Sequence, residues 1–254
     1  MRKLAAVLPV QRRQAILRAV RDGTSGVGEL AQEFRVSEMT VRRDLRHLAR
    51  EGKLERVHGG AVSAEREPPF SEIAVARLTV KDRIGALAAG LVEDGQTVML
   101  DIGTTTLQVA RHLRGRSLTV ITTNLAAYQE LLPEPGIELV LPGGVVRRNY
   151  RSLVGVLAED ALRQLRADVA FLGASGVDDD LSVVDSTMVE VPIKRAMIGS
   201  AAKTVLLADS AKFGMRGAVR VCGAPEVDVL VTDDGAPTAA CEALRRAGVE
   251  LIAV

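Results

Sequence analysis

From residue 71 to the end of the chain, short apolar runs alternate with longer stretches of helical periodicity. The apolar runs predict strands at 97–101, 118–122, 137–141, 168–172, 204–208, 228–231 and 249–253. Apolar residues three or four positions apart predict a helix at 71–93 with a break near 79, and helices at 156–165, 187–201 and 237–247. Two more helices are predicted, one that follows residues 101–106 and runs to about 114, and one that follows the strand 118–122 and runs to 132. Strands separated by helices predict an α/β domain with a mainly parallel sheet covered on both faces.

The first sixty residues follow a different pattern, with three short amphipathic segments at 12–20, about 27–34 and 38–50. Ser37 precedes the third segment, and its hydroxyl is suited to accept a free amide N–H at the start of that helix. The residues expected to face inward are Ile16, Leu17, Val20, Leu30, Ala31, Phe34, Val41, Leu45 and Leu48. A short helix, a tight turn and a basic helix are the arrangement of a helix-turn-helix.

The third helix is expected to enter the DNA major groove, where arginines contact phosphates or guanine. The stretch 53–62 predicts a β-hairpin, or wing, after that helix. Arginines on a single amphipathic helix are more often a solvated face, but the capped turn and the basic wing together favour DNA binding. The candidate DNA-binding residues are Ser37, Met39, Thr40, Arg42, Arg43, Arg46, Arg56 and His58.

Charge is divided unevenly along the chain, although the formal net charge is only +1. Residues 1–60 carry 13 Lys and Arg against 7 Asp and Glu, whereas the remaining 194 residues carry 20 against 25. A basic head on an acidic body indicates that the head meets a polyanion. Aromatic residues make up 2% of the chain, which argues against binding single-stranded nucleic acid by stacking.

Cysteine and histidine content predicts neither a metal site nor a cofactor. The two cysteines and three histidines have no metal-ligand spacing, and the cysteines form no disulfide framework. The first ten residues lack a signal-peptide cleavage pattern, and no apolar run reaches membrane-spanning length. We therefore expect a cytoplasmic protein without membrane partners.

Small and polar residues follow the predicted strands of the body. The sequence Asp-Ile-Gly-Thr-Thr-Thr at 101–106 runs into a helix, whose free amides and positive end are suited to an anion. Lys212 is a candidate countercharge, and Asp101 is a candidate acceptor from a sugar hydroxyl or from Lys212. Because ligands bind at the carboxyl ends of parallel strands, these loops predict one pocket. The candidate effector-binding residues are Asp101, Gly103, Thr104, Thr105, Thr106, Thr123, Asn124, Gly143, Gly144, Arg147 and Lys212.

Two alternatives compete with a regulator that senses a ligand. A sugar-phosphate isomerase or deaminase needs a general base, for which Asp101, Asp209 and Glu190 are candidates, but no pair of residues is diagnostic of catalysis. A purely dimerising body would leave the polar loops unexplained. Because a regulator needs both a DNA-binding head and a pocket, we expect a sensor with no catalytic residue, acting as a dimer or tetramer on double-stranded operator DNA.

The residues quoted above resemble the DeoR family of bacterial transcription regulators. The runs 36–48 and 52–61 are similar to its winged helix-turn-helix. The segments 101–106, 123–124, 141–144, 190–197 and 209–214 are similar to its C-terminal sensor domain, whose fold is similar to that of ribose-5-phosphate isomerase. The resemblance implies a repressor of a carbohydrate-catabolism operon, with a phosphorylated sugar or polyol as effector.

The resemblance also implies roles for individual residues. It assigns residues 101 and 103–106 to a phosphate loop, residues 123, 124, 143 and 144 to the pocket wall, and Lys212 to the anion. The stretch 178–185 departs from the family pattern, because it carries four acidic residues and is expected to be a solvated loop. A charged stretch with two prolines at 63–70 predicts a linker, so the expected domains are 1–62 and 73–254, joined by 63–72.

Overall fold

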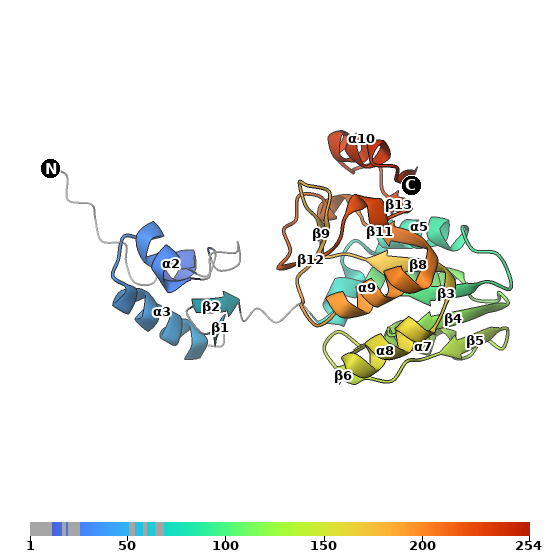
Figure 1. The fold of residues 1–254 in the computed structure, drawn as a ribbon, viewed down its shortest axis with the longest axis horizontal. Coiled ribbons are helices and arrows are strands. Elements are labelled where there is room, and N and C mark those ends of the chain that lie inside the picture. The colour runs from blue at the N-terminus through green and yellow to red at the C-terminus, as the bar shows by residue number, and fades with distance from the viewer. Residues whose placement is uncertain (1–11, 17–18, 20–25, 51–53, 58–59, 64–68) are drawn as a thin grey trace. The chain divides into compact units, whose positions relative to one another are not determined.

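A computed structural model of the chain describes residues 12–16, 19, 26–50, 54–57, 60–63 and 69–254 (Figure 1). The chain forms two compact units, residues 1–67 and residues 68–254, which we call the head and the sensor domain. Leu17, Val20 and His58 of the sequence predictions lie outside the described residues.

The described head contains helical residues at 12–16 and 19, followed by α2 (Val27–Glu33) and α3 (Glu38–Arg50). The strands β1 (Leu54–Val57) and β2 (Gly60–Ser63) then pair antiparallel, as the predicted wing requires. A core of aliphatic side chains holds the helices together, and most of the predicted inward-facing residues belong to it. The most deeply buried of these residues are Ile16, Leu30, Val41, Leu45 and Leu48.

The sensor domain is built on a seven-stranded sheet whose strands all run parallel. Its strands are β3 (Thr97–Leu100), β4 (Leu118–Thr122), β5 (Ile137–Val140), β8 (Ala167–Gly173), β11 (Ala201–Leu207), β13 (Val229–Thr232) and β14 (Glu250–Ala253). They lie in the order β14-β13-β11-β8-β3-β4-β5. All seven predicted strands are confirmed. The order reverses between β3 and β8, which is where parallel sheets bind ligands.

Helices cover both faces of the sheet (Figure 1). One face packs against α5 (Leu78–Ala89), α6 (Thr104–His112) and α7 (Leu125–Leu131). The other packs against α8 (Val156–Gln164), α9 (Val191–Ser200) and α10 (Thr238–Arg246). Because side chains alternate along a strand, Leu100 and Phe171 enter the first core whereas Met99 and Leu172 enter the second. No helix in the described part of the chain has the length and apolar character that crossing a membrane requires.

Several short elements differ from the sequence predictions. The predicted helix 71–93 is two helices, α4 (Phe70–Val75) and α5, and α4 begins within the predicted linker. Between them, Arg77 has φ of 52°, in the left-handed region. The hairpin of β6 (Val145–Arg147) and β7 (Ser152–Val154) was not predicted. Nor was a small sheet of β9 (Gly176–Val177), β10 (Val183–Asp185) and β12 (Val219–Cys222), or the 3-10 turns η1 (Ser210–Lys212) and η2 (Ala224–Glu226).

Candidate functional site

The start of α3 is held by the predicted serine cap. The amide N–H of Thr40 donates to Ser37 Oγ at 3.2 Å, and the Ser37 and Thr40 hydroxyls lie 2.9 Å apart. Met39 is 76% exposed on the first turn. The cap therefore fixes a helix end whose first turn presents an apolar and a hydroxyl side chain.

Three arginines of α3 lie on its exposed side, as predicted. Arg42 pairs with Glu38 at 3.2 Å, one turn earlier on the same helix. Arg46 donates to the backbone oxygen of Arg42 at 3.2 Å. Arg43 is exposed and has no hydrogen bond or ion pair with the described residues, so its guanidinium is available to a partner. Arg56 lies on β1, and its side chain, like His58, is outside what the structure describes.

A buried ion pair inside the head was missed by the sequence analysis. Arg12 Nε lies 2.7 Å from Asp44 Oδ2, and both side chains are less than a tenth exposed. Asp44 follows Arg43 directly in α3, so adjacent residues have opposite roles. A charged residue inside the Val41–Leu48 apolar stripe was the available signal.

The predicted loop at 101–106 joins β3 to α6. Gly103 has φ of 123°, a conformation that side chains disfavour, and its carbonyl accepts from Thr106 Oγ1 at 3.0 Å. Thr104, Thr105 and Thr106 form the first turn of α6. The first amides of a helix have no partner within it, so this turn presents N–H donors at the positive helix end.

Asn124 holds this loop in place. Its Nδ2 donates to the carbonyl of Gly103 at 3.0 Å and that of Asp101 at 3.3 Å. Its Oδ1 accepts from the amides of Ala126 and Ala127 at the start of α7. Asn124 is fully buried. The predicted wall residue therefore ties the carboxyl ends of β3 and β4 together.

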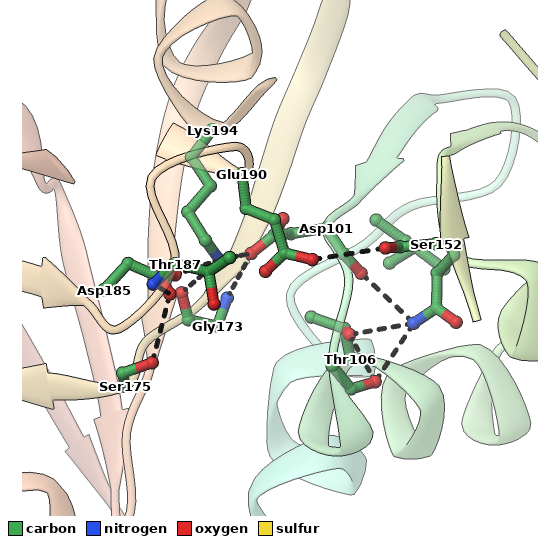
Figure 2. A network of polar contacts seen from close by, with 12 residues as sticks. Asp101, Thr106, Ser152, Gly173, Ser175, Asp185, Thr187, Glu190 and Lys194 are labelled. Atoms are coloured by element: carbon green, nitrogen blue, oxygen red, sulfur yellow. Dashed lines mark hydrogen bonds and ion pairs between the residues drawn. The ribbon is translucent and has the colours of Figure 1, made fainter. Parts of the chain in front are cut away.

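A buried ion pair lies at the switch point between β3 and β8 (Figure 2). Asp101 is fully buried, and its Oδ2 accepts from Lys194 Nζ and from the Gly173 amide at 2.9 Å. Lys194 Nζ also donates to the Gly173 carbonyl at 2.9 Å. The predicted partner of Asp101, Lys212, was therefore wrong: the lysine at this carboxylate comes from α9.

The switch-point cluster has more negative than positive charge. Asp185 Oδ2 lies 3.5 Å from Lys194 Nζ, so two buried carboxylates face one ammonium group. Burial alone would lower the pKa of Lys194, but Asp101 and Asp185 outweigh it and raise that pKa. Burial raises the pKa of Asp101, although Lys194 acts in the opposite direction. Lys194 therefore stays charged at neutral pH.

Two acceptors near the switch point have no partner among the described residues. Asp101 Oδ1 and Thr123 Oγ1 are both buried and make no hydrogen bond. A buried polar atom without a partner costs about 1–3 kcal/mol, which a bound hydroxyl or amine can recover.

The β6–β7 hairpin supplies a further wall of this site. Arg147 pairs with Glu190, which is buried and also accepts from Ser152 Oγ at 3.2 Å. The Arg147 guanidinium lies 5.4 Å from the centre of the Tyr150 ring. Figure 2 shows Glu190 and Ser152 facing each other beside Asp101. The predicted Arg147 therefore contacts Glu190 of the switch-point region, whereas Gly143 and Gly144 lie in the loop between β5 and the hairpin.

The acidic stretch 178–185 is divided between two environments. Asp178 and Asp180 accept hydrogen bonds from backbone amides of their own turn. Asp185, by contrast, is buried at Lys194, so the prediction of a solvated loop was wrong for this residue. Ser175 Oγ donates to Asp185 at 3.2 Å, and the Thr187 amide donates at 3.1 Å.

A second charged cluster lies where β11 and β13 end, on the side of α5. Arg77 pairs with Asp209 at 3.1 Å and with Asp233 at 3.3 Å, which fixes its left-handed backbone. Lys81 of α5 is buried, and its Nζ donates to the Ile73 carbonyl at 2.6 Å. The sequence analysis missed Lys81, although a lysine on the apolar face of α5 was a usable signal.

Lys81 and the predicted Lys212 act on each other electrostatically. Burial, reinforced by Lys212, lowers the pKa of Lys81 to about 8. Asp209 opposes that shift. Lys81 and Lys212 therefore influence each other at the carboxyl edge of the sheet, with the carboxylate of Asp209 nearby.

The close approach of α5 to α6 brings Lys81 toward the threonine loop. A Cβ on Gly85 would lie 2.6 Å from the Cβ of Gln108, so the helices touch there. Both helices begin at the carboxyl edge of the sheet. One turn before the contact stand Lys81 on α5 and Thr104 on α6. The anion-binding groups predicted from sequence therefore share this edge with Lys81.

The described residues contain no cluster of three or more His, Cys, Asp or Glu arranged for a metal ion. The carboxyl edge of the sheet instead carries the first-turn amides of α6, the lysines Lys81 and Lys194, and the buried carboxylates of Asp101 and Asp185.

Comparison with known proteins identifies the family of both parts of the chain. Residues 12–67 match the DeoR-like helix-turn-helix domain, and residues 77–234 match the DeoR C terminal sensor domain. The chain is 37% identical over 251 residues to the uncharacterized HTH-type transcriptional regulator YgbI of Escherichia coli K12, covering 97% of this chain and 98% of that protein. It is 32% identical over 245 residues to the glycerol-3-phosphate regulon repressor of the same strain, covering 95% and 97%.

Among solved structures, ribose 5-phosphate isomerase A from Methanocaldococcus jannaschii aligns with a TM-score of 0.41 and 21% identity, over 54% of this chain and 55% of that one. The full-length relatives are named as regulators or repressors, which decides against the isomerase or deaminase alternative. The chain belongs to the DeoR family of helix-turn-helix transcriptional regulators.

Proposed function

We propose that this regulator represses a carbohydrate-catabolism operon and leaves its operator when a phosphorylated sugar or polyol binds the sensor domain. The observation that carries the proposal is the pairing of two subsites at one sheet edge. One is cationic, at Lys81 and Lys212, and the other is a buried carboxylate with a free acceptor, at Asp101. The name of the glycerol-3-phosphate regulon repressor supports a polyol phosphate as the effector class.

The phosphate end of the effector lies at the start of α6. Amides of Thr104 to Thr106 donate to it along the helix axis, and Lys81 and Lys212 supply charge. Gly103 leaves the backbone open on this side. Its positive φ is a conformation that glycine adopts with little strain and that other residues disfavour.

The hydroxyl end lies at the switch point. Asp101 Oδ1 accepts a hydrogen bond from a hydroxyl group there, and Thr123 Oγ1 offers a second hydrogen-bonding group. Arg147 and Glu190 form the outer wall, where Glu190 is already bound to Ser152. The effector is therefore recognised by one charged end and one hydroxyl-bearing end.

The head binds operator DNA through α3 in the major groove. Ser37, Met39 and Thr40 lie at its exposed start, and Arg42, Arg43 and Arg46 reach phosphates or guanine edges. Repeated half-sites require an even number of heads, so a homodimer or homotetramer fits. To change the regulator from mostly operator-bound to mostly free, the effector must bind the operator-free state more tightly by several kcal/mol.

The first test measures the melting temperature of the full chain with sugar and polyol phosphates, each beside its unphosphorylated parent. A ligand at one hundred times its Kd stabilises the folded state by about 2.7 kcal/mol, or roughly 5–10 °C for a domain of this size. We expect shifts only with phosphorylated compounds. The same compound should lower operator occupancy in a mobility-shift assay without being converted.

Two results would count against this function. A panel with no phosphate-dependent shift removes the phosphate site, and turnover of the bound compound restores the enzyme alternative. Operator binding that ignores a stabilising phosphate would leave a ligand site without regulation.

Effector affinity should depend on pH through Lys81. With a pKa of about 8, roughly nine tenths of this lysine is protonated at pH 7 and roughly one tenth at pH 9. The effector phosphate is already a dianion in this range, because its second pKa is near 6. Titration calorimetry should therefore show affinity falling about tenfold from pH 7 to pH 9.

The Lys81→Met variant should bind weakly at pH 7 and lose this pH dependence. Lys203→Met removes an exposed lysine and should match the wild type. Stability gives an independent check, because a folded-state pKa below 10.5 means that Lys81 adds to the free energy of unfolding a contribution that rises between about pH 8 and 10.5. The raised pKa of buried Cys222 acts in the opposite direction, so the contribution of Lys81 is measured as the difference between the wild type and Lys81→Met. A pH dependence that survives in Lys81→Met would exclude this lysine from the phosphate site.

A further inference from the structure

Met39 is the one large apolar side chain of the described helices α2 and α3 that is exposed, at 76%. The other large apolar residues of these two helices lie in the core of the head. A single exposed apolar residue needs no explanation by itself. Met39, however, is the second residue of α3, and a helix-turn-helix places this helix in the major groove with its first residues at the base edges.

The other side chains at the start of α3 are bonded to one another. Ser37 Oγ accepts from the amide of Thr40 at 3.2 Å, and the two hydroxyls lie 2.9 Å apart. Glu38 pairs with Arg42 at 3.2 Å. The thioether of Met39 is at most a weak acceptor, so this side chain recognises what it touches by shape and apolar contact.

The face of α3 that carries Met39 also carries an available cation. Arg43 lies four residues later, so the two side chains are neighbours on the same helix face. Arg43 is exposed and has no hydrogen bond or ion pair with the described residues. An exposed methionine beside an available guanidinium indicates that this face of α3 meets the DNA.

The major groove offers such a methionine one kind of apolar group. The base edges there present hydrogen-bond donors and acceptors, and thymine presents its 5-methyl group in addition. An apolar side chain in the groove therefore distinguishes bases through contact with that methyl group. The unbranched, flexible chain of methionine adapts well to an irregular surface of this kind.

We infer that Met39 contacts the 5-methyl group of a thymine in each half-site of the operator and thereby selects thymine at that position. The inference rests on the proposed placement of α3 in the major groove. It adds a base preference that arginines do not supply when they contact phosphates. Loss of one buried methyl group should weaken binding about fourfold at each half-site.

The test removes the methyl group from the DNA. The full wild-type chain first selects duplexes from a random-sequence library, and each thymine of the selected duplex is then replaced in turn by deoxyuridine. Deoxyuridine keeps the O4 acceptor and the base pair and lacks only the 5-methyl group. Titration should identify one thymine per half-site whose replacement weakens binding about fourfold, and about fifteenfold when both half-sites are changed.

Variants of the protein assign this preference to one side chain. Met39→Ala should bind the thymine and the uracil duplex equally, no more tightly than the wild type binds the uracil duplex. Met39→Leu keeps an apolar side chain of similar volume and should keep the preference for thymine. Because residue 39 is exposed, neither change should alter the melting temperature.

Two controls remove other groups of the same kind. Thr40→Ser deletes the second methyl group of this helix turn and keeps the hydroxyl of the cap. Met188→Ala deletes a methionine of the sensor domain that is 72% exposed. Both variants should prefer the thymine duplex as strongly as the wild type does.

Two results overturn the inference. A preference for thymine that persists in Met39→Ala assigns the methyl contact to another side chain. Binding by Met39→Ala that is weaker to every sequence by the same factor, with the thymine preference unchanged or absent in the wild type, places Met39 against the sugar-phosphate backbone.

The same titrations separate this inference from the proposed function. A wild-type chain that selects no sequence rejects base contacts by α3, and the inference with them. Selective binding that a phosphorylated compound releases, but that ignores every thymine methyl group, rejects the inference alone. Thymine selection that depends on Met39 and that no phosphorylated compound changes supports the inference and rejects the proposed effector.

Discussion

Replacing Lys194 by Met is expected to destabilise the sensor domain by about 3–5 kcal/mol. The change leaves the buried carboxylates of Asp101 and Asp185 without their shared ammonium group. Loss of a whole buried partner is costly because the remaining charges keep their desolvation penalty. The pKa of Asp101, already raised by burial, should rise further.

Urea unfolding at several pH values measures this effect. The deficit should be large at neutral pH and shrink as pH falls, because the carboxyls then become neutral in the folded and unfolded states alike. Lys203→Met, which removes an exposed lysine of β11, should cost less than about 1 kcal/mol. A second variant, Asp101→Asn with Lys194→Met, should recover part of the loss. Equal unfolding curves for the two lysine variants would contradict the role given to the buried pair.

Adjacent residues of α3 should give opposite results when each is changed to alanine. Asp44→Ala removes the carboxylate that Arg12 contacts inside the head and should cost about 3–5 kcal/mol, enough to unfold a head of this size. Arg43→Ala removes an exposed side chain and should leave stability within about 0.5 kcal/mol. If Arg43 contacts a base, Arg43→Ala should nevertheless weaken operator binding by about 1–3 kcal/mol.

Circular dichroism and operator titrations at several salt concentrations separate these effects. Loss of a phosphate contact lowers the slope of log affinity against log salt by about one, whereas loss of a base contact relaxes discrimination at one position. An Arg43→Ala head that melts early but binds normally would place Arg43 outside the groove. An Asp44→Ala variant with wild-type stability would contradict the stabilising role given to the Arg12–Asp44 ion pair.

The central strands β3, β8 and β13 were predictable because they are largely buried on both faces and appear as mainly apolar runs. The edge strands β5 and β14 are only partly buried but are still marked by short apolar runs. The short strands outside this sheet were not predictable. The hairpin strands β6 and β7 have three residues each, and β10 pairs with β12 from more than thirty residues away. Pairing between such distant segments depends on the folded sheet and leaves no local period in the sequence.

The position of the candidate site was predictable, but the side chains that contact its residues were predictable only in part. Asp101 and the threonines follow β3 as expected, because the strand pattern fixes where loops leave the sheet. Lys194 and Lys81 were missed, since lysines within helices are usually assigned to solvent. Which lysine reaches Asp101 depends on how α9 packs against β8, and sequence spacing does not encode that distance.

Two backbone features also depend on tertiary contacts. Arg77 adopts a left-handed conformation that favours glycine, and ion pairs to residues more than 130 positions away hold it there. The break in the predicted helix 71–93 was expected near residue 79 and lies two residues earlier for this reason.

The position of α4 decides how such a regulator can be recombined with a different head. Phe70 is buried against Leu107 and Ala126, its amide donates to the Asn149 carbonyl at 2.9 Å, and its ring stands edge-on to Tyr150. A hybrid joined after residue 72 would lose Phe70 and open this cluster beside the β6–β7 hairpin. A chimera that keeps Pro69 and everything after it retains the cluster, so heads are exchangeable between regulators only when the junction lies on the head side of that proline.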